Sequence, residues 1–230
     1  MSATDPAPAT VAELLDELAA LENPRMRAVN ERRGDDHGVN LSSLRTIAKR
    51  LTTQHPLALE LWATEVTAAR LLALLVCRPK EFSADELDRM LREARAPKVR
   101  DWLLSHAVRK SPHTEALRRR WIDDPDPIVA AAGWRLTAVR IGRQSEGLDL
   151  PGLLDTIEAS MAEAPEPLQW TMNETLAAIG IEHPELRARA IAIGERLRVL
   201  EDYPTPPNCT SPYAPVWIAE IVRRREAAAQ

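Results

Sequence analysis

One stretch of the chain places an acid, a hydroxyl and a base at intervals of four residues. These are Asp101, Ser105 and Arg109, and Trp102 stands beside the first of them. Residues four apart lie on one face of an α-helix, so a helix over 98–110 would present these side chains as one polar stripe. The spacing therefore predicts a surface on which the three groups could act together next to an indole ring.

A second candidate is Trp134, on a helix expected over 127–142. The larger apolar residues of that segment share one face, whereas Trp134 faces roughly the other way, among alanines. The neighbouring Gly133 permits close approach of another backbone. Trp134 either packs against the next pair of helices, as large aromatic residues usually do, or lines a groove where it could lie against a sugar or a base.

Basic residues in this chain are mainly arginine, because only four of the 30 are lysine. Arginine forks bind phosphate through two hydrogen bonds, so clusters such as the one holding Arg135 and Arg140 are candidate nucleic-acid contacts. The formal net charge of −4 argues against a surface that is positive throughout, but it does not exclude local basic patches. The alternative is that these arginines are solvated side chains on exposed helix faces.

Proline is the feature that organises these candidates along the chain. The 18 prolines and eight glycines fall mostly between short apolar segments of helical period, and nothing indicates a strand. Pairs such as His55-Pro56, Ser111-Pro112, Asp126-Pro127 and His183-Pro184 place proline where the first turn of a helix tolerates it. The pattern predicts an all-α protein with helices over 9–21, 42–54, 56–62, 64–77, 84–95, 98–110, 113–123, 127–142, 150–162, 167–180, 184–200 and 214–226.

Helices of this length, joined by tight corners, indicate stacked helical pairs. We expect an α-solenoid of about five or six helical pairs, with a concave surface along one side. A compact, irregular helical domain is the alternative. Residues 9–230 are expected to form a single domain after a flexible N-terminus, residues 1–8. The segment 68–76 should be the most buried, and the polar connection 23–40 has the composition of a functional loop.

Several classes of protein are disfavoured by the sequence. It has no apolar run of membrane-spanning length and no secretory leader, so we expect no membrane partner and a cytoplasmic location. Cys77 and Cys209 have no zinc spacing, and we expect no metal. No glycine-rich phosphate loop is present, which disfavours nucleotide cofactors. We expect no cofactor and a monomer.

Several strings of the sequence are distinctive: RDWL at 100–103, DDPDPIV at 123–129 leading into AGWRLT at 132–137, DYP at 202–204 and CTSPYAPVWI at 209–218. They resemble the DNA alkylation repair family, the AlkD-like alkylpurine DNA glycosylases of HEAT-like repeats. The resemblance extends from about residue 39 to residue 225 and is most specific in the C-terminal segment.

The resemblance implies an α-solenoid of HEAT-like repeats whose basic concave groove holds double-stranded DNA, alkylated or not. It also implies removal of cationic N3- or N7-alkylated purines by one aspartate and two tryptophans beside the sugar, with an arginine nearby. Asp101 matches the aspartate, unless the alignment slips by three residues and places Leu104 there. Pro97 stands where the active branch has its first tryptophan.

The other two positions are also displaced. The family's arginine falls near Ala130, with Arg135 as a possible substitute, and its second tryptophan falls near Asn173 and Glu174, with Trp170 about one turn away. The sequence is typical of a divergent branch.

Three functions therefore stay open. In the first, the protein is a metal-free N-glycosylase with Asp101 as the electrostatic group and Trp102 or Trp134 against the sugar. In the second, it is a non-catalytic helical module that binds nucleic acid structures. In the third, it is a scaffold for a protein partner. The segment 203–215 is expected to cap the last helices, with contact to nucleic acid as its alternative.

Overall fold

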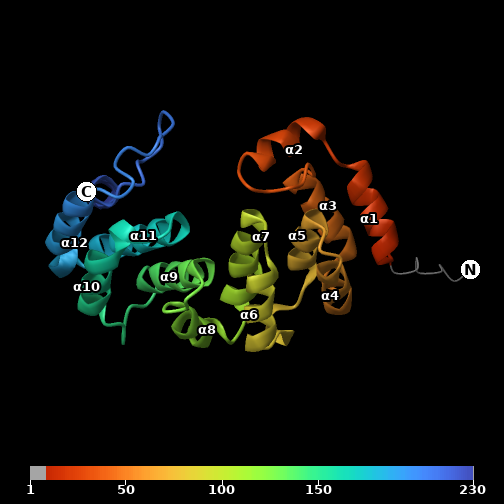
Figure 1. The fold of residues 1–230 in the computed structure, drawn as a ribbon, viewed down its shortest axis with the longest axis horizontal. Coiled ribbons are helices and arrows are strands. Elements are labelled where there is room, and N and C mark those ends of the chain that lie inside the picture. Colours follow the sequence, from red (N-terminus) through yellow and green to blue (C-terminus); the bar gives the residue numbers. More distant parts are fainter. Residues whose placement is uncertain (1–8, 230) are drawn as a thin grey trace, which may run out of the picture. The chain divides into compact units, whose positions relative to one another are not determined.

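The computed structural model describes residues 9–229, so the flexible N-terminus expected for residues 1–8 lies outside the described residues. Within 9–229 every regular element is a helix (Figure 1), which confirms the all-α prediction. The α-helices are α1 Val11–Ala20, α2 Pro24–Glu31, α3 Leu41–Leu51, α4 His55–Ala63, α5 Thr67–Val76, α6 Ala84–Glu93, α7 Pro97–Trp102, α8 Thr114–Trp121, α9 Pro127–Ile141, α10 Leu150–Ser160, α11 Glu166–Glu182, α12 Pro184–Leu197 and α13 Ala214–Ala228.

The chain divides into two compact units, one ending at Thr114 and one beginning at Glu115. Each is described by itself below. The single domain expected over 9–230, and the groove expected along it, stay predictions.

Proline and side-chain caps set the helix starts as the sequence indicates. Pro56, Pro127 and Pro184 each lie in the first turn of a helix, whereas Pro112 lies in the turn that precedes α8. At α6, the hydroxyl of Ser83 accepts from the amide of Glu86 while the Glu86 carboxylate accepts from the amide of Ser83, so the expected capping box is present.

In the first unit, α5 is the central helix. Eight of its ten residues are buried, which confirms the expectation for 68–76. One of them is Arg70, whose guanidinium carbon lies 4.8 Å from the ring centroid of Trp62. Arg70 also donates to the backbone oxygens of Trp62 (3.2 Å) and Glu93 (3.0 Å), so a buried charge joins α4, α5 and the end of α6.

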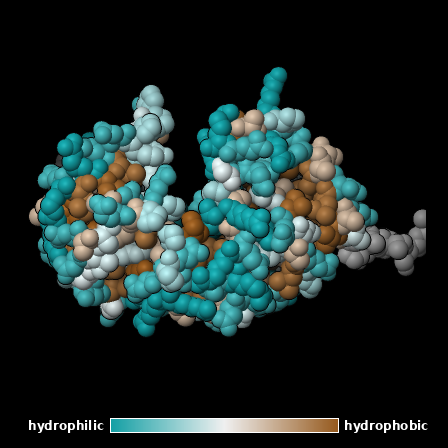
Figure 2. All heavy atoms as spheres, viewed as in Figure 1, coloured by the Kyte–Doolittle hydropathy of each residue, from teal (hydrophilic) through white to brown (hydrophobic). Residues whose placement is uncertain are grey.

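In the second unit, α9 and α11 pack together and share a core with α10, α12 and α13. Gly133 brings α9 against the end of α8, because a Cβ there would lie 2.4 Å from the backbone nitrogen of Ile122. On the face that Figure 2 shows, hydrophilic side chains cover most of the surface, with patches of hydrophobic side chains among them.

Two elements differ from the expectation. The segment 23–40, expected to be one long connection, contains α2, which Asn23 caps through hydrogen bonds to the amides of Arg25 and Met26. The helix expected over 98–110 is α-helical only as far as Trp102. It continues as a π-helical turn, Leu103–Ala107, and a 3-10 turn, Val108–Lys110.

Candidate functional site

The helix that carries Asp101 and Trp102 is held at its start by a distant loop. The residue before α7 is Ala96, which has no side chain that could cap the helix. Asp35 supplies the cap instead, because its carboxylate accepts a 2.8 Å hydrogen bond from the amide of Lys98. At the same place Gly34, with φ of +83°, lies against the ring of Pro97.

The rest of that loop is fixed by further hydrogen bonds. The hydroxyl of Thr67 on α5 donates to the carboxylate of Asp36, and the amide of Gly38 donates to Glu22 at 2.9 Å. The Asn30 side chain on α2 donates to the backbone oxygen of His37 at 2.8 Å. His37 is itself buried, and burial lowers the pKa of its imidazole. The loop is thus a clamp that sets the start of α7.

Asp101 is exposed near the end of α7, as the sequence predicts. Among the described residues its carboxylate has no hydrogen-bond or ion-pair partner. It is therefore available to a cationic ligand without first giving up a bond inside the protein.

Trp102, the next residue, is only 7% exposed because two side chains cover it. The guanidinium carbon of Arg45, on α3, lies 5.5 Å from the centroid of the indole, and the His106 ring lies 4.9 Å away at a 34° tilt. The Ser105 hydroxyl lies 2.8 Å from Nδ1 of His106. The predicted contact between Trp102 and a sugar would require Arg45 or His106 to move.

The surroundings of His106 lower the pKa of its imidazole and so favour the neutral form. Burial lowers its pKa first, and the nearby charges of Lys110 and Arg45 lower it further. A neutral imidazole can pack against the indole of Trp102 without placing a third positive charge beside those of Arg45 and Lys110. The hydroxyl of Ser105 therefore contacts the imidazole of His106 and is not part of an exposed polar stripe.

The predicted stripe of Asp101, Ser105 and Arg109 depended on regular α-helical spacing. That spacing ends at Trp102, because the following turn is π-helical and has hydrogen bonds one residue longer. Asp101 is exposed, whereas Ser105 and Arg109 are half-buried. The structure therefore keeps Asp101 as a surface group and corrects the expectation of three polar residues in one continuous line.

Trp134 packs inside the protein, which is the first of the two alternatives expected for it. It is 3% exposed and belongs to the core of the second unit, and its backbone oxygen accepts a 3.1 Å hydrogen bond from Thr175 on α11. This corrects the alternative in which Trp134 lines a groove, because a side chain so deeply buried offers no face to a sugar or base. The neighbouring Gly133 permits the close approach of another backbone, as expected, because a Cβ there would lie 2.4 Å from the backbone nitrogen of Ile122.

The two arginines predicted to contact DNA from α9 both have acidic neighbours. Nη1 of Arg135 lies 3.8 Å from the carboxylate of Glu174, and the Arg135 side chain is 41% exposed. Arg140 forms an ion pair with Glu115 and donates to the backbone oxygen of Glu146 at 2.8 Å. Arg135 could reach a phosphate, whereas Arg140 would first have to leave Glu115.

Trp170 is half-buried near the start of α11 and contacts the C-terminal segment. Its ring meets that of Tyr203 edge to face, with centroids 5.1 Å apart. One turn further, the buried side chain of Asn173 donates a 2.7 Å hydrogen bond to the backbone oxygen of Pro212. The position where the resemblance implies a second tryptophan therefore holds this segment in place.

The candidates thus form two groups. The first unit holds Asp101, Trp102, Ser105 and Arg109, and the second holds Trp134, Arg135, Arg140 and Trp170. Sequence reasoning missed Arg45, His106 and Asp35. Arg45 is one of many arginines, and Asp35 acts on a residue 63 positions away, so only the fold reveals their contacts.

Nothing in the described part of the chain gathers three or more His, Cys, Asp or Glu side chains as a metal site. None of the helices in residues 9–229 is both long enough and apolar enough to cross a bilayer.

Comparison with known proteins decides the family. The family model described as DNA alkylation repair enzyme matches residues 14–218. The chain belongs to this family. The DNA alkylation repair resemblance seen in the strings at 100–103 and 209–218 is thereby confirmed.

Curated relatives of this DNA alkylation repair protein include two from Listeria. The uncharacterized protein Lin0241 of Listeria innocua is 24% identical over 192 residues, and the uncharacterized protein Lmo0209 of Listeria monocytogenes is 23% identical over 192 residues. Both alignments cover 79% of this chain and 84% of the relative.

A solved structure shows the same fold, with a TM-score of 0.78 at 21% identity, covering 94% of this chain and 95% of the other. It represents a new family of proteins related to the HEAT-like repeat DNA glycosylases, with affinity for branched DNA structures. The helices of this DNA alkylation repair protein therefore form a HEAT-like repeat fold, as predicted.

Proposed function

We propose that this member of the DNA alkylation repair family binds double-stranded DNA and releases cationic N3- or N7-alkylated purines as an N-glycosylase. The observation that carries the proposal is Asp101, an exposed carboxylate without a partner among the described residues. It stands on a helix whose start is clamped by Asp35.

Cleavage of the N-glycosidic bond of a cationic purine needs few catalytic groups from the protein. An alkylated purine carries a positive charge, so when its N-glycosidic bond breaks the base takes the electron pair and leaves neutral. The deoxyribose becomes an oxocarbenium ion, which water attacks at C1′ with loss of a proton to solvent. A carboxylate near the sugar stabilises this cation electrostatically, and we assign that role to Asp101.

The burial of two candidate residues, one in each unit, favours a second candidate, DNA binding without excision. Both tryptophans expected against the sugar are buried, at 7% for Trp102 and 3% for Trp134. A protein of this kind would bind DNA through exposed arginines such as Arg45 and Arg135 and leave the base in place. The affinity of the solved neighbour's family for branched DNA is consistent with such a role.

Excision can be tested on a duplex with a single N7-methylguanine, by counting abasic sites through alkaline strand cleavage. We expect release by the wild-type protein and a fall of about 100-fold for Asp101→Asn, because the substitution removes the charge and keeps the shape. Asp123→Asn is the matched control, since Asp123 is also an exposed carboxylate but lies in the second unit. The control should retain the wild-type rate.

Equal rates for the wild-type protein and Asp101→Asn would remove the assigned role. No release by any variant, together with tight binding that weakens steeply with salt, would establish the second candidate instead.

A further inference from the structure

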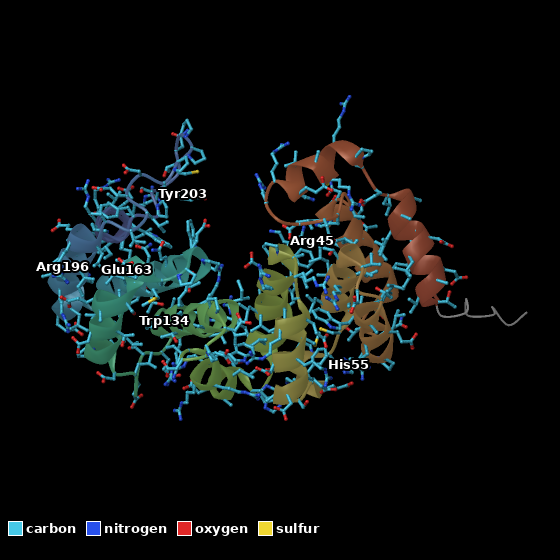
Figure 3. All side chains as sticks on the ribbon, in the orientation of Figure 1. Arg45, His55, Trp134, Glu163, Arg196 and Tyr203 are labelled. Carbon is cyan, nitrogen blue, oxygen red and sulfur yellow. The ribbon has the colours of Figure 1, made fainter. Side chains whose placement is uncertain are left out.

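The C-terminal segment forms a pocket that the roles assigned above do not use. It lies between α11 and α13, is about 250 Å³ in volume and opens to the surface. Its walls include the flat aromatic rings of Trp170, Tyr203 and Trp217, and the other residues that matter here are Pro206, Thr210 and Pro212. Figure 3 shows Tyr203 on the segment that follows α12.

The pocket is preformed. Arg198, Leu200 and Asn208 hold positive φ angles of 54°, 63° and 66°, a conformation that is uncommon for residues other than glycine and asparagine and that defines the path of this segment. Prolines in the same segment fix further φ angles. The buried Asn173 then ties the far end of the segment to α11 through Pro212. Little ordering would be needed when a ligand binds.

Its lining determines what kind of ligand fits. No Lys, Arg, Asp or Glu lines the pocket, so a phosphate or a charged peptide end would find no counter-ion there. The walls are rings, and hydroxyls such as that of Thr210 stand among them. The volume lies below the roughly 300–1,000 Å³ typical of sites for drug-sized ligands, so one flat ring system suits it.

Tyr203 is the residue best placed to receive such a ring. Its side chain is 45% exposed, an unusual position for a large aromatic residue, although its edge-to-face contact with Trp170 fixes its orientation. A plain capping role, the first expectation for this segment, would account for the buried parts of the segment. It does not require an exposed aromatic ring over an open pocket.

We propose that this pocket binds one unpaired nucleobase of DNA held by the protein, stacked on Tyr203 and Trp170. The proposal rests on the DNA binding proposed above, because DNA supplies neutral flat rings that become accessible wherever pairing is interrupted. Stacking of a base on an aromatic side chain favours binding of DNA with an unpaired base over a perfect duplex, in which every base is already stacked and paired.

The test compares two DNAs of the same length, one fully paired and one with a single unpaired 2-aminopurine. Binding is measured by fluorescence anisotropy, and stacking by 2-aminopurine emission. For the wild-type protein we expect tighter binding to the second DNA and a fall in emission on binding. Tyr203→Ala should lose about tenfold in affinity for that DNA and remove the fall in emission, with little change on the paired duplex.

Two further variants serve as controls. Tyr203→Phe keeps the ring and should behave as wild type, whereas a loss in this variant would show that the hydroxyl rather than stacking is responsible and would overturn the proposal. Val216→Ala changes an exposed apolar residue of α13 that does not line the pocket, and should have no effect on either DNA.

Equal affinity of Tyr203→Ala and wild type for both DNAs, or unchanged emission, would overturn the pocket proposal and leave excision through Asp101 standing. Binding of a peptide in the pocket, with no preference for the unpaired base, would equally overturn it. Failure of excision with a retained preference for the unpaired base would overturn only the glycosylase role. Absence of all DNA binding would overturn both.

Discussion

The carboxylate of Glu115 binds several arginines that would otherwise form an unpaired basic cluster. It forms ion pairs with Arg118, Arg119 and Arg140, and its 2.9 Å hydrogen bonds to the first two hold the network on α8. Hydrogen bonds from Arg118 lower the pKa of Glu115 most, with Arg140 and Arg119 adding to the effect, to about 2. Arg140, a predicted DNA contact, is thus engaged with Glu115 inside the second unit, together with Arg118 and Arg119.

Replacing Glu115 with Gln should destabilise the folded protein. Since its side chain is 41% exposed, solvent screening limits the loss to about 1 kcal/mol in the free energy of unfolding, as measured by urea denaturation at pH 7. The folded pKa lies below the ordinary value of 4.5, so this stabilisation is present above pH 4.5 and disappears as the pH falls towards 2.

The difference between wild type and Glu115→Gln should therefore shrink through that window. Glu163→Gln is the control, because Glu163 is exposed and has no ion-pair partner among the described residues. A difference that stays constant from pH 7 to pH 2 would contradict the role given to Glu115.

For single residues, the exposure of Asp101 could be predicted from the sequence, but the side chains that surround it could not. An acidic residue opposite an apolar helix face is expected at the surface, and Asp101 is exposed. The cover that Arg45 and His106 place over Trp102 could not be predicted, because it depends on how α3 packs near α7. The burial of Trp134 was one of two alternatives that periodicity alone could not separate.

Among the elements, α7 depends most on a residue outside itself. Its six residues begin without a local cap, so Asp35 provides the acceptor that the exposed amides of the first turn need. Because Asp101 is on this short helix, the loop influences the site without contacting a ligand.

Asp35→Ala should cost about 1 kcal/mol of stability, the usual effect of losing an N-cap acceptor. It should also speed hydrogen exchange at the amides of the first turn of α7. Asp35→Asn keeps a side-chain oxygen acceptor and should stay close to wild type. Unchanged exchange at the Lys98 amide in Asp35→Ala would show that the loop does not hold the helix.

Most element boundaries were predictable because proline and capping residues mark them locally. Pro127 and the capping box of Ser83 and Glu86 are such signals, and both are present as expected. The π-helical turn after Trp102 carries no such mark, since its residues have ordinary helical propensities. The short helix α2 was missed because its polar residues show no apolar face, and only its cap and its first-turn proline indicate it.

For the whole molecule, a formal net charge of −4 and an expected affinity for DNA are compatible only if local arginines act together. Many arginines of the described chain are already paired, which lowers the number that can meet phosphate. Arg45 is exposed and its guanidinium lies over Trp102, so it is the best candidate in the first unit.

Arg45→Ala should weaken binding to an undamaged duplex and lower the slope of log affinity against log salt by about one, the value for one lost phosphate contact. Arg119→Ala is the control, because that guanidinium is already bound to Glu115. Equal slopes for wild type and Arg45→Ala in a salt titration would exclude Arg45 as a phosphate contact.

The fold class was predictable at this scale, since the spacing of prolines and apolar residues admits little besides helices, and the strings shared with the family indicated HEAT-like repeats. The division after Thr114 was not, because the corner at Ser111-Pro112 resembles the others in composition. The local sequence shows where a helix begins, but it does not show which helices pack together into one compact unit.

The two cysteines differ in a way that gives experimenters a native reporter. Cys77 is buried, and burial raises the pKa of its thiol to about 11, so thiol reagents should leave it unmodified in the folded protein. Cys209 is exposed in the wall of the aromatic pocket. A maleimide dye would therefore attach at one known place without engineering, beside the rings whose occupancy it could then report in real time.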